Sequence, residues 1–234
     1  MYAKYHMRKF GTTEEQMAKV AVKNRLNAMR NPKAVFKESI TIDDVLHSKP
    51  IVDPIKLLDC SMLCSGSAAV LLFSEEKIKQ VTDNPVWIKG IGRHTASASF
   101  SSVLADLSSI LSAKKAANDA YKMAKISPNR IDVVELHDAF TILEIIAYED
   151  LGFADKGKGG KFVNEHRMDI NPRGGILGCG HAVGATGVAQ TAEIVAQLGN
   201  QATGRQVKQC KNGLILNLAA AGTSATVVIL GTET

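Results

Sequence analysis

Apolar residues recur every three or four positions in several stretches of the chain, and this spacing predicts helices with one buried face. The predicted helices are 12–29, 104–124, 140–152 and 187–199. In the first, Thr13 and Gln16 have the spacing of a capping box, and Gly152 and Gly199 close two of the others. Residues that commonly begin and end helices therefore lie where the periodicity places the ends.

Shorter apolar runs predict strands. They are 66–74, 86–94, 131–138 and a pair within 213–230 that is separated by a turn of small residues. The runs 66–74 and 86–94 are almost continuously apolar, which predicts strands that are covered on both faces. Residues 31–56 contain three prolines and are expected to be loop-rich. Because the remaining strands alternate with helices, the chain is predicted to be an α/β protein.

The composition is that of a globular protein, with 45% hydrophobic and 22% charged residues. No run of eighteen apolar residues is present, so no membrane span is expected, and the first ten residues lack the apolar core of a signal peptide. Four scattered cysteines without a CxxC pair argue against a disulfide framework and against a metal site. These features predict a reduced, cytoplasmic protein.

Basic residues are concentrated at the start of the chain. Residues 1–40 hold nine Lys/Arg and three Asp/Glu, a net charge of +6, whereas the rest of the chain is close to neutral. Such a segment fits a phosphate-bearing ligand, and it equally fits a solvated, lysine-rich face. Nucleic acid is a poorer fit, because aromatic residues make up only 5% and no recognition motif is present.

Two histidines are the candidates for chemistry. His137 follows the predicted strand 131–138 at its carboxyl end, where open α/β sheets bind ligands. His181 lies in "GCGHAVGATG" (178–187), where glycines allow backbone and ligand to approach closely. From spacing alone each could be a structural histidine. If they act together, both are expected at strand-to-helix junctions and in one pocket.

Several segments together resemble one family. "NPRGGILGCGHAVGATGVAQTAEI" (171–194) and "ELHDAFTILEIIAYEDLGF" (135–153) are similar to motifs of the archaeal and sterol-carrier-protein branch of the thiolase superfamily. Segments 5–36 and 57–72 also resemble that branch. The resemblance implies the layered αβαβα fold of thiolases. It divides the chain into residues 1–100, an incomplete N-terminal half with a basic, loop-rich insert, and residues 101–234, a complete C-terminal domain. Only two predicted strands precede residue 100, which agrees with this division.

The resemblance also implies a site. His181 would activate a cysteine nucleophile and help to hold the thioester oxygen, and His137 would complete the polar pocket. No permanently bound cofactor is implied, since coenzyme A and acyl-CoA are substrates in this family. Contacts with coenzyme A or substrate are expected from Lys23, Arg25, Gly180, Gly184 and Gly222.

The chain departs from the family at its cysteines. The nucleophilic cysteine of thiolases lies in the first half of the protein, and Cys60 and Cys64 are expected near a buried strand instead. Where the family places a second cysteine, this chain has Ala139 and the cysteine-free turn "NLAAAGTS". Ala182 replaces the proline of the histidine loop, and Cys179 is expected to be a small loop filler.

These departures leave three functions open. The chain is predicted to be a component of a thiolase-type acyltransferase for short acyl-CoA thioesters, with the cysteine supplied by a separate N-terminal chain. The alternatives are a thiolase-like acyl-CoA lyase or retro-aldolase, and a non-catalytic acyl-CoA-binding subunit. The expected partners are the N-terminal half, further copies in a homo- or hetero-oligomer, and a zinc-ribbon/OB-fold companion. A symmetric assembly of such pairs is plausible because thiolases form dimers.

Overall fold

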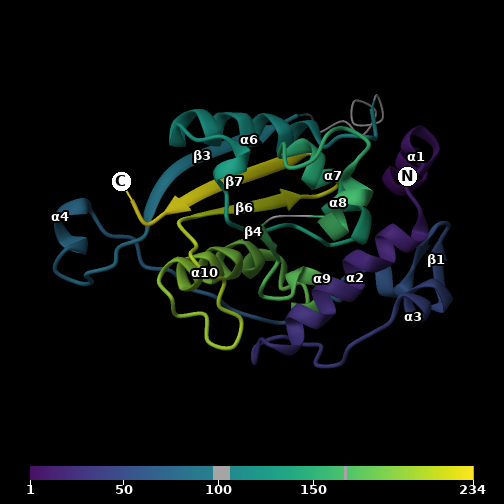
Figure 1. Cartoon of the computed structure of the whole chain (residues 1–234), viewed down its shortest axis with the longest axis horizontal. Coiled ribbons are helices and arrows are strands. Elements are labelled where there is room, and N and C mark those ends of the chain that lie inside the picture. Colours follow the sequence, from purple (N-terminus) through teal and green to yellow (C-terminus); the bar gives the residue numbers. More distant parts are fainter. Residues whose placement is uncertain (97–105, 166–167, 234) are drawn as a thin grey trace.

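The computed structural model describes residues 1–96, 106–165 and 168–233. A five-stranded sheet with the strand order β3-β7-β6-β4-β5 lies at its centre (Figure 1). The strands are β3 (Trp87–Thr95), β4 (Val133–Glu135), β5 (Asp169–Ile170), β6 (Asn212–Ala219) and β7 (Ser224–Gly231). β4 is parallel to β5 and β6, whereas β7 is antiparallel to both β6 and β3. With helices around this sheet, the predicted α/β class is confirmed.

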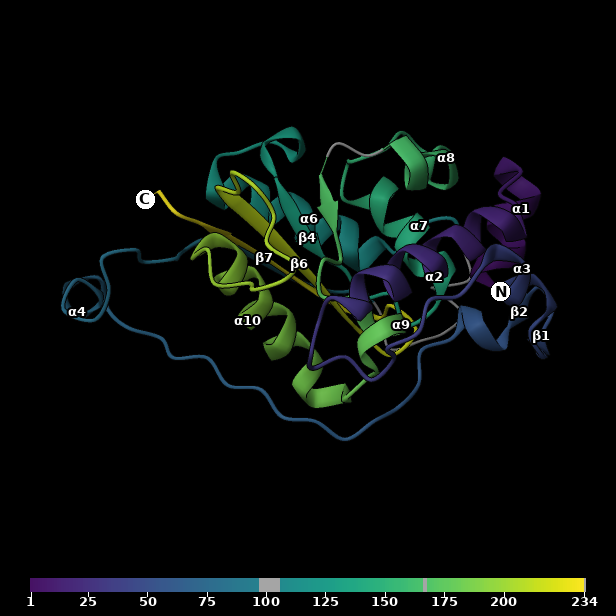
Figure 2. The same cartoon turned by 60° about the horizontal axis from the view of Figure 1, so that its bottom comes forward.

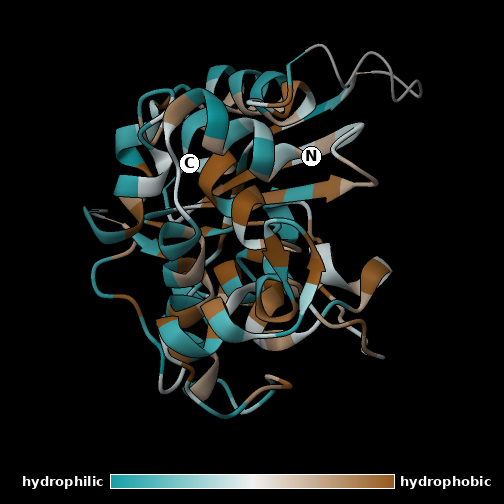
Figure 3. Ribbon diagram, turned by 90° about the vertical axis from the view of Figure 1, so that its right-hand side faces the viewer, coloured by the Kyte–Doolittle hydropathy of each residue, from teal (hydrophilic) through white to brown (hydrophobic). Residues whose placement is uncertain are grey.

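Helices cover both faces of the sheet. Figure 1 shows α6 (Leu111–Ala124) on one side and α10 (Thr186–Leu198) on the other. Successive side chains of a strand point to opposite faces. On β6, Leu214 and Leu216 therefore join the core under α6, and Ile215 joins the smaller core under α10. Figure 3 shows apolar strands between more polar helices.

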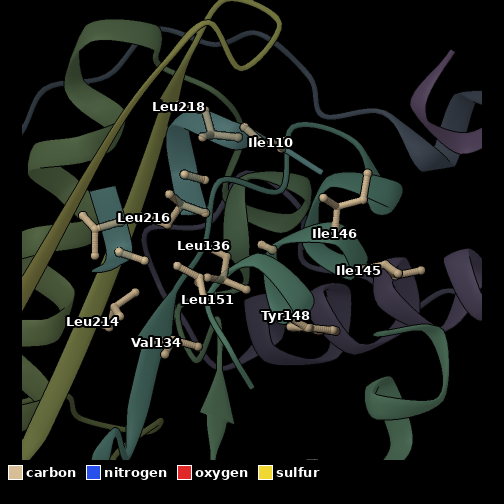
Figure 4. Packing of buried hydrophobic residues seen from close by; sticks show 14 of the residues in the cluster. Ile110, Val134, Leu136, Ile145, Ile146, Tyr148, Leu151, Leu214, Leu216 and Leu218 are labelled. Carbon is tan, nitrogen blue, oxygen red and sulfur yellow. The ribbon is translucent and has the colours of Figure 1, made fainter. Parts of the chain in front are cut away.

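The larger core also packs α7 (Thr141–Asp150) against the sheet. Figure 4 shows Leu136 and Leu151 between the side chains of β6 and those of Ile146 and Tyr148 in α7. This core anchors the end of β4, and therefore the residues that follow it. Burying one such aliphatic or aromatic side chain contributes about 1.5–3 kcal/mol.

The remaining elements lie mainly in the first 80 residues and around α7. They are α1 (Tyr2–Phe10), α2 (Glu14–Met29), α3 (Ile42–His47), β1 (Pro50–Val52), β2 (Ile55–Lys56), α4 (Glu75–Ile78), α8 (Gly159–Glu165) and α9 (Gly175–Cys179), with short 3-10 turns at Leu57–Asp59, Pro128–Arg130 and Val183–Ala185. α2 packs on α7, α8 and α9. Its predicted capping box is present, with Thr13 and Gln16 bonded reciprocally.

The predicted strand 66–74 is wrong. Residues 66–74 belong to no strand, and Figure 2 shows them in an extended segment that runs outside the sheet to α4. Leu71 and Leu72 are 81% and 78% exposed. A strand needs a neighbour for its backbone hydrogen bonds. The described residues of this chain offer none beside this apolar run (70–73), so β propensity alone does not make it a strand.

The prediction that 86–94 is covered on both faces is also wrong. β3 is the edge strand of the sheet, its residues alternate in burial, and α6 covers one face. The helix approaches so closely that a Cβ atom on Gly92 would lie 1.8 Å from the Ala116 carbonyl oxygen. The glycines that interrupt the apolar run therefore mark close helix–strand contact.

Other boundaries shift. The 31–56 segment, predicted to be loop-rich, contains α3, β1 and β2, so the described residues 1–96 hold three strands rather than two. The helix predicted from 104 begins at Leu111, residues 106–110 are not helical, and 104–105 lie outside the described residues. A side chain fixes this start, because the Asp150 carboxylate accepts the N–H of Ile110 at 2.6 Å.

Candidate active site

His137 lies in the connection between β4 and α7. The core behind β4 and α7 leaves it 8% exposed. The next residue anchors this connection to the glycine-rich loop, because the buried Asp138 carboxylate accepts the N–H groups of Ile176 and Leu177 in α9. These two hydrogen bonds join the two candidate segments.

His181 lies between α9 and α10, in the glycine-rich loop. The prediction that it sits at a strand-to-helix junction is therefore wrong, because a helix precedes it. Gly180 beside it has a φ of 82°, a conformation that favours glycine. The loop is held by the chain around Met62 and Cys64: the His181 N–H donates to the Met62 carbonyl at 2.7 Å, and the His181 carbonyl accepts from the Cys64 N–H at 3.2 Å.

The two imidazole rings meet. Their centroids are 5.2 Å apart and their planes lie at 86°, an edge-to-face contact. The predicted convergence of His137 and His181 on one place is thus confirmed. The Nδ1 atom of His181 is 2.9 Å from the Thr186 hydroxyl in α10, and the Nδ1 atom of His137 is 3.3 Å from the Asn217 side-chain amide in β6.

Both rings are held in their neutral form. Burial, and secondarily the neighbouring His181, lowers the pKa of His137 from its ordinary 6.5 to about 4. Burial also lowers the pKa of His181. Near pH 7 the pair can therefore exchange a proton with a ligand or donate hydrogen bonds without carrying charge at rest.

Three of the four cysteines have raised pKa values and are unsuited to act with this pair. Cys179 donates its thiol hydrogen to the Arg173 carbonyl at 3.0 Å, and burial raises its pKa to about 12. Burial also raises the pKa of the Cys60 thiol, and it raises that of Cys210 to about 12. Cys64 packs against Gly180. The raised pKa values keep the thiols of Cys60, Cys179 and Cys210 protonated near neutral pH, which agrees with the structural role expected for Cys60 and Cys179.

The residues predicted to contact coenzyme A are dispersed. Lys23 points inward, where its ammonium group is 2.9 Å from the buried Glu144 carboxylate. The Arg25 guanidinium stacks 3.4 Å above the ring of Phe36. Their role in ligand binding stays a prediction, and the internal partner of Lys23 counts against it.

The three predicted glycines differ in their surroundings. Gly180 and Gly184 flank His181, and a Cβ atom on Gly184 would meet no other atom within 4 Å. Gly222 lies in the turn after β6, where its carbonyl accepts the Ser112 hydroxyl at 2.6 Å. Gly180 and Gly184 thus surround one imidazole, whereas Gly222 belongs to the turn that follows Asn217.

Sequence reasoning missed three side chains around the histidines. They are Thr186, Gln190 and Asn217. The available signal was Asn217, a polar residue inside the apolar strand run "LILNL". Within the described residues, no group of three or more His, Cys, Asp or Glu side chains could hold a metal ion. No described helix is long and apolar enough to cross a membrane.

Comparisons with known proteins agree with these motifs. A family model, "Thiolase C-terminal domain-like", matches residues 92–232. An acetyl-CoA acetyltransferase of Methanothermobacter thermautotrophicus is 42% identical over 98% of this chain and 61% of its own length. The benzoylsuccinyl-CoA thiolase subunit BbsB of Thauera aromatica is 34% identical over 96% of this chain and 60% of its own. The chain thus spans about three fifths of these relatives.

Solved structures agree with the fold. The Ltp2-ChsH2(DUF35) aldolase has a TM-score of 0.87 and 26% identity over 99% of this chain and 62% of that one. The Bacillus anthracis acetyl-CoA acetyltransferase has a TM-score of 0.74 and 16% identity over 99% of this chain and 59% of that one. The second likeness is one of fold alone.

Proposed function

The chain belongs to the thiolase family, and from that membership we propose that it is a component of a thiolase-type acyl-CoA C-acyltransferase. The proposed substrates are short acyl-CoA thioesters, and coenzyme A is a substrate rather than a resident cofactor. One observation carries the proposal: His137 and His181 lie edge to face in the histidine and glycine motifs that resemble those of the family. The acetyl-CoA acetyltransferase relatives support the same reaction class.

The proposed chemistry uses both imidazoles. His181 takes the proton of a cysteine thiol, and the thiolate attacks the keto carbon of a 3-ketoacyl-CoA. Hydrogen bonds from the site hold the oxygen that becomes negative. The carbon–carbon bond then breaks, the released enolate takes a proton to give acetyl-CoA, and free coenzyme A removes the acyl group from the cysteine.

We further propose that the cysteine comes from a thiolase N-terminal half on a separate polypeptide. Two observations support this. The protonated, internally bonded Cys179 and the half-buried Cys60, whose pKa is raised, are unsuited to the task. The apolar run (70–73) is exposed, and exposed extended segments of this kind favour pairing with another chain.

The remaining parts of the proposal concern organisation. We propose a first unit, 1–100, and a C-terminal domain, 101–234, although β3 pairs with β7 and so joins the first unit to the sheet of the second. We also propose a homo- or hetero-oligomer with a zinc-ribbon/OB-fold companion; the two-part name of the Ltp2-ChsH2(DUF35) aldolase and the subunit name of BbsB support a partner chain. A cytoplasmic location rests on the cysteine usage alone.

A specific observation favours a second function, that of an acyl-CoA lyase or retro-aldolase. Ala139 and the turn "NLAAAGTS" carry no cysteine, and the chain resembles the Ltp2-ChsH2(DUF35) aldolase. Retro-aldol cleavage needs a base for a substrate hydroxyl and donors for the developing enolate. Two neutral imidazoles can supply both.

The test compares the full chain alone with the full chain mixed with a thiolase N-terminal half, using acetoacetyl-CoA thiolysis as the assay. We expect thiolysis only in the mixture, and its loss in His181→Ala but not in His47→Ala, a control at an exposed histidine. Cleavage of a 3-hydroxyacyl-CoA by the chain alone, without the N-terminal half that carries the cysteine, would favour the lyase. Coenzyme A binding without either reaction would favour the non-catalytic subunit.

A further inference from the structure

Two side-chain amides connect the imidazole of His137 to a backbone carbonyl. The Gln190 Nε2 atom donates to the Leu136 carbonyl at 2.8 Å, and the Asn217 Nδ2 atom donates to Gln190 Oε1 at 3.1 Å. The same Asn217 nitrogen is 3.3 Å from His137 Nδ1. Gln190 is fully buried, so water does not compete for its amide, whereas Asn217 is half-buried.

The direction of every hydrogen bond follows from the first. A carbonyl oxygen can only accept, so Gln190 must present its NH2 group to Leu136 and its oxygen to Asn217. Asn217 must therefore present its own NH2 group. One of the two amide hydrogens goes to Gln190, and the other points to His137 Nδ1, which has to accept it. A neutral ring whose Nδ1 accepts carries its proton on Nε2.

We propose that Asn217 is a positioning residue that, through Gln190 and the Leu136 carbonyl, holds His137 as the tautomer protonated at Nε2. His137 is then a fixed hydrogen-bond donor towards the site. Thr186 acts differently on His181, because a hydroxyl can either donate or accept and so allows both tautomers. The two histidines thus divide the work: His137 donates to the oxygen that becomes negative, and His181 moves protons. This division of roles rests on the proposed function, whereas the tautomer does not.

The packing around Asn217 is consistent with a side chain that is held in one position. A Cβ atom on Gly187 would lie 3.2 Å from the Asn217 amide nitrogen, so this position of α10 leaves little room beyond glycine. The turn that follows β6 is held at two points: the Tyr2 hydroxyl donates to the Ala221 carbonyl at 2.9 Å, and Ser112 bonds Gly222. Because burial keeps His137 neutral near pH 7, its tautomer decides what it offers to a ligand.

The test reads the tautomer directly from two-bond 1H–15N correlation spectra of the full chain labelled with 15N-histidine. The chain has six histidines, and the signal missing in His137→Gln identifies His137. At pH 7.5 we expect the shift of an unprotonated Nδ1 and a protonated Nε2. In Asn217→Asp a carboxylate replaces the donor, so the proton should move to Nδ1 or the pKa of His137 should rise. Asn212→Asp, on the same strand and bonded to the Arg130 carbonyl, should leave His137 unchanged.

Two results would overturn the proposal: a proton on Nδ1 in the unmodified chain, or an unchanged His137 signal in a folded Asn217→Asp variant. Should that variant not fold, Gln190→Ala decides, because it frees the Asn217 amide to turn over and should mix the two tautomers. Failure to detect thiolysis would contradict the catalytic role proposed for the two histidines, but it would not affect the tautomer that the spectra report. In an active mixture, Asn217→Asp should lower kcat by about 100-fold, as expected for a lost oxyanion donor, with KM changed less than about twofold.

Discussion

Replacing Lys23 by methionine tests whether this basic residue serves the fold or coenzyme A. Methionine keeps much of the apolar stem and removes the ammonium group. Lys23 lies 16% exposed beside a Glu144 carboxylate that is fully buried, at 2.9 Å. The substitution therefore leaves a buried carboxylate without its cation, which is among the more destabilising changes in a protein interior.

The magnitude follows from the other partners of Glu144. Its carboxylate also accepts from the side-chain amides of Asn24 and Asn171, at 2.8 and 2.6 Å, and from the Tyr148 hydroxyl. These neutral donors remain in Lys23→Met. The free energy of unfolding should therefore fall by about 3 kcal/mol, the lower end of the range for breaking a buried ion pair. For a chain of this length that corresponds to a fall in Tm of about 6–12 °C.

The assay is thermal and urea unfolding, combined with coenzyme A binding by calorimetry. Lys19→Met is the matched control, since Lys19 lies on the same helix and pairs with the exposed Glu15. Such an i,i+4 pair contributes only about 0.3–0.5 kcal/mol. If Lys23→Met unfolds like Lys19→Met but loses affinity for coenzyme A, the structural role argued for Lys23 is refuted and its predicted ligand contact is supported.

Three further predictions follow from individual side chains. Gly92→Ala should lower the free energy of unfolding by about 3 kcal/mol, because its Cβ would meet the Ala116 carbonyl. Gly184→Ala should change the free energy of unfolding by less than about 0.5 kcal/mol, and urea unfolding of both variants checks this. The pKa of His137 falls from 6.5 to about 4 on folding, so between these pH values the unfolded chain binds a proton that the folded chain does not. Stability should therefore decrease as the pH falls from 6.5 to about 4, and His137→Phe should reduce the dependence of the urea midpoint on pH in this range. Cys179 should react with an alkylating reagent at pH 8 much more slowly in the folded chain than in urea, and equal rates by mass spectrometry would contradict its burial and raised pKa.

Periodicity and capping residues were sufficient to predict the helices that carry the site. α2 and α10 lie where their apolar spacing and end residues placed them, because each has an apolar face against its neighbours. α7 also lies where predicted, although it is buried on nearly all sides. The α6 start could not be predicted, since it depends on a hydrogen bond from Ile110 to Asp150, forty residues away. The wrong prediction of a strand at 66–74 has the same origin. An apolar run indicates that a segment is suited to burial, but it does not show whether a neighbouring strand is available to pair with it.

The histidines were found from the sequence because glycines and a strand end surround them. The hydrogen-bond partners of the histidines were not found, because these partners are distant along the chain. Asn217 is 80 residues from His137, and Gln190 is 54 residues from Leu136. Such contacts arise from the order of strands in the sheet, where β6 lies beside β4. Sequence spacing does not contain that order.

One segment links the two halves of the site to the exposed apolar run. Within residues 60–64, the Ser61 N–H donates to the Ala139 carbonyl at 2.9 Å, beside the His137 connection, and Met62 and Cys64 bond the backbone of His181. The chain then continues within ten residues to the exposed apolar run (70–73). A partner that pairs with this run would contact the chain immediately after the segment that joins both histidine loops. The histidine pair is already in contact in the single chain, so a partner at 70–73 is expected to act on the position of the two histidine loops through the backbone hydrogen bonds of 60–64.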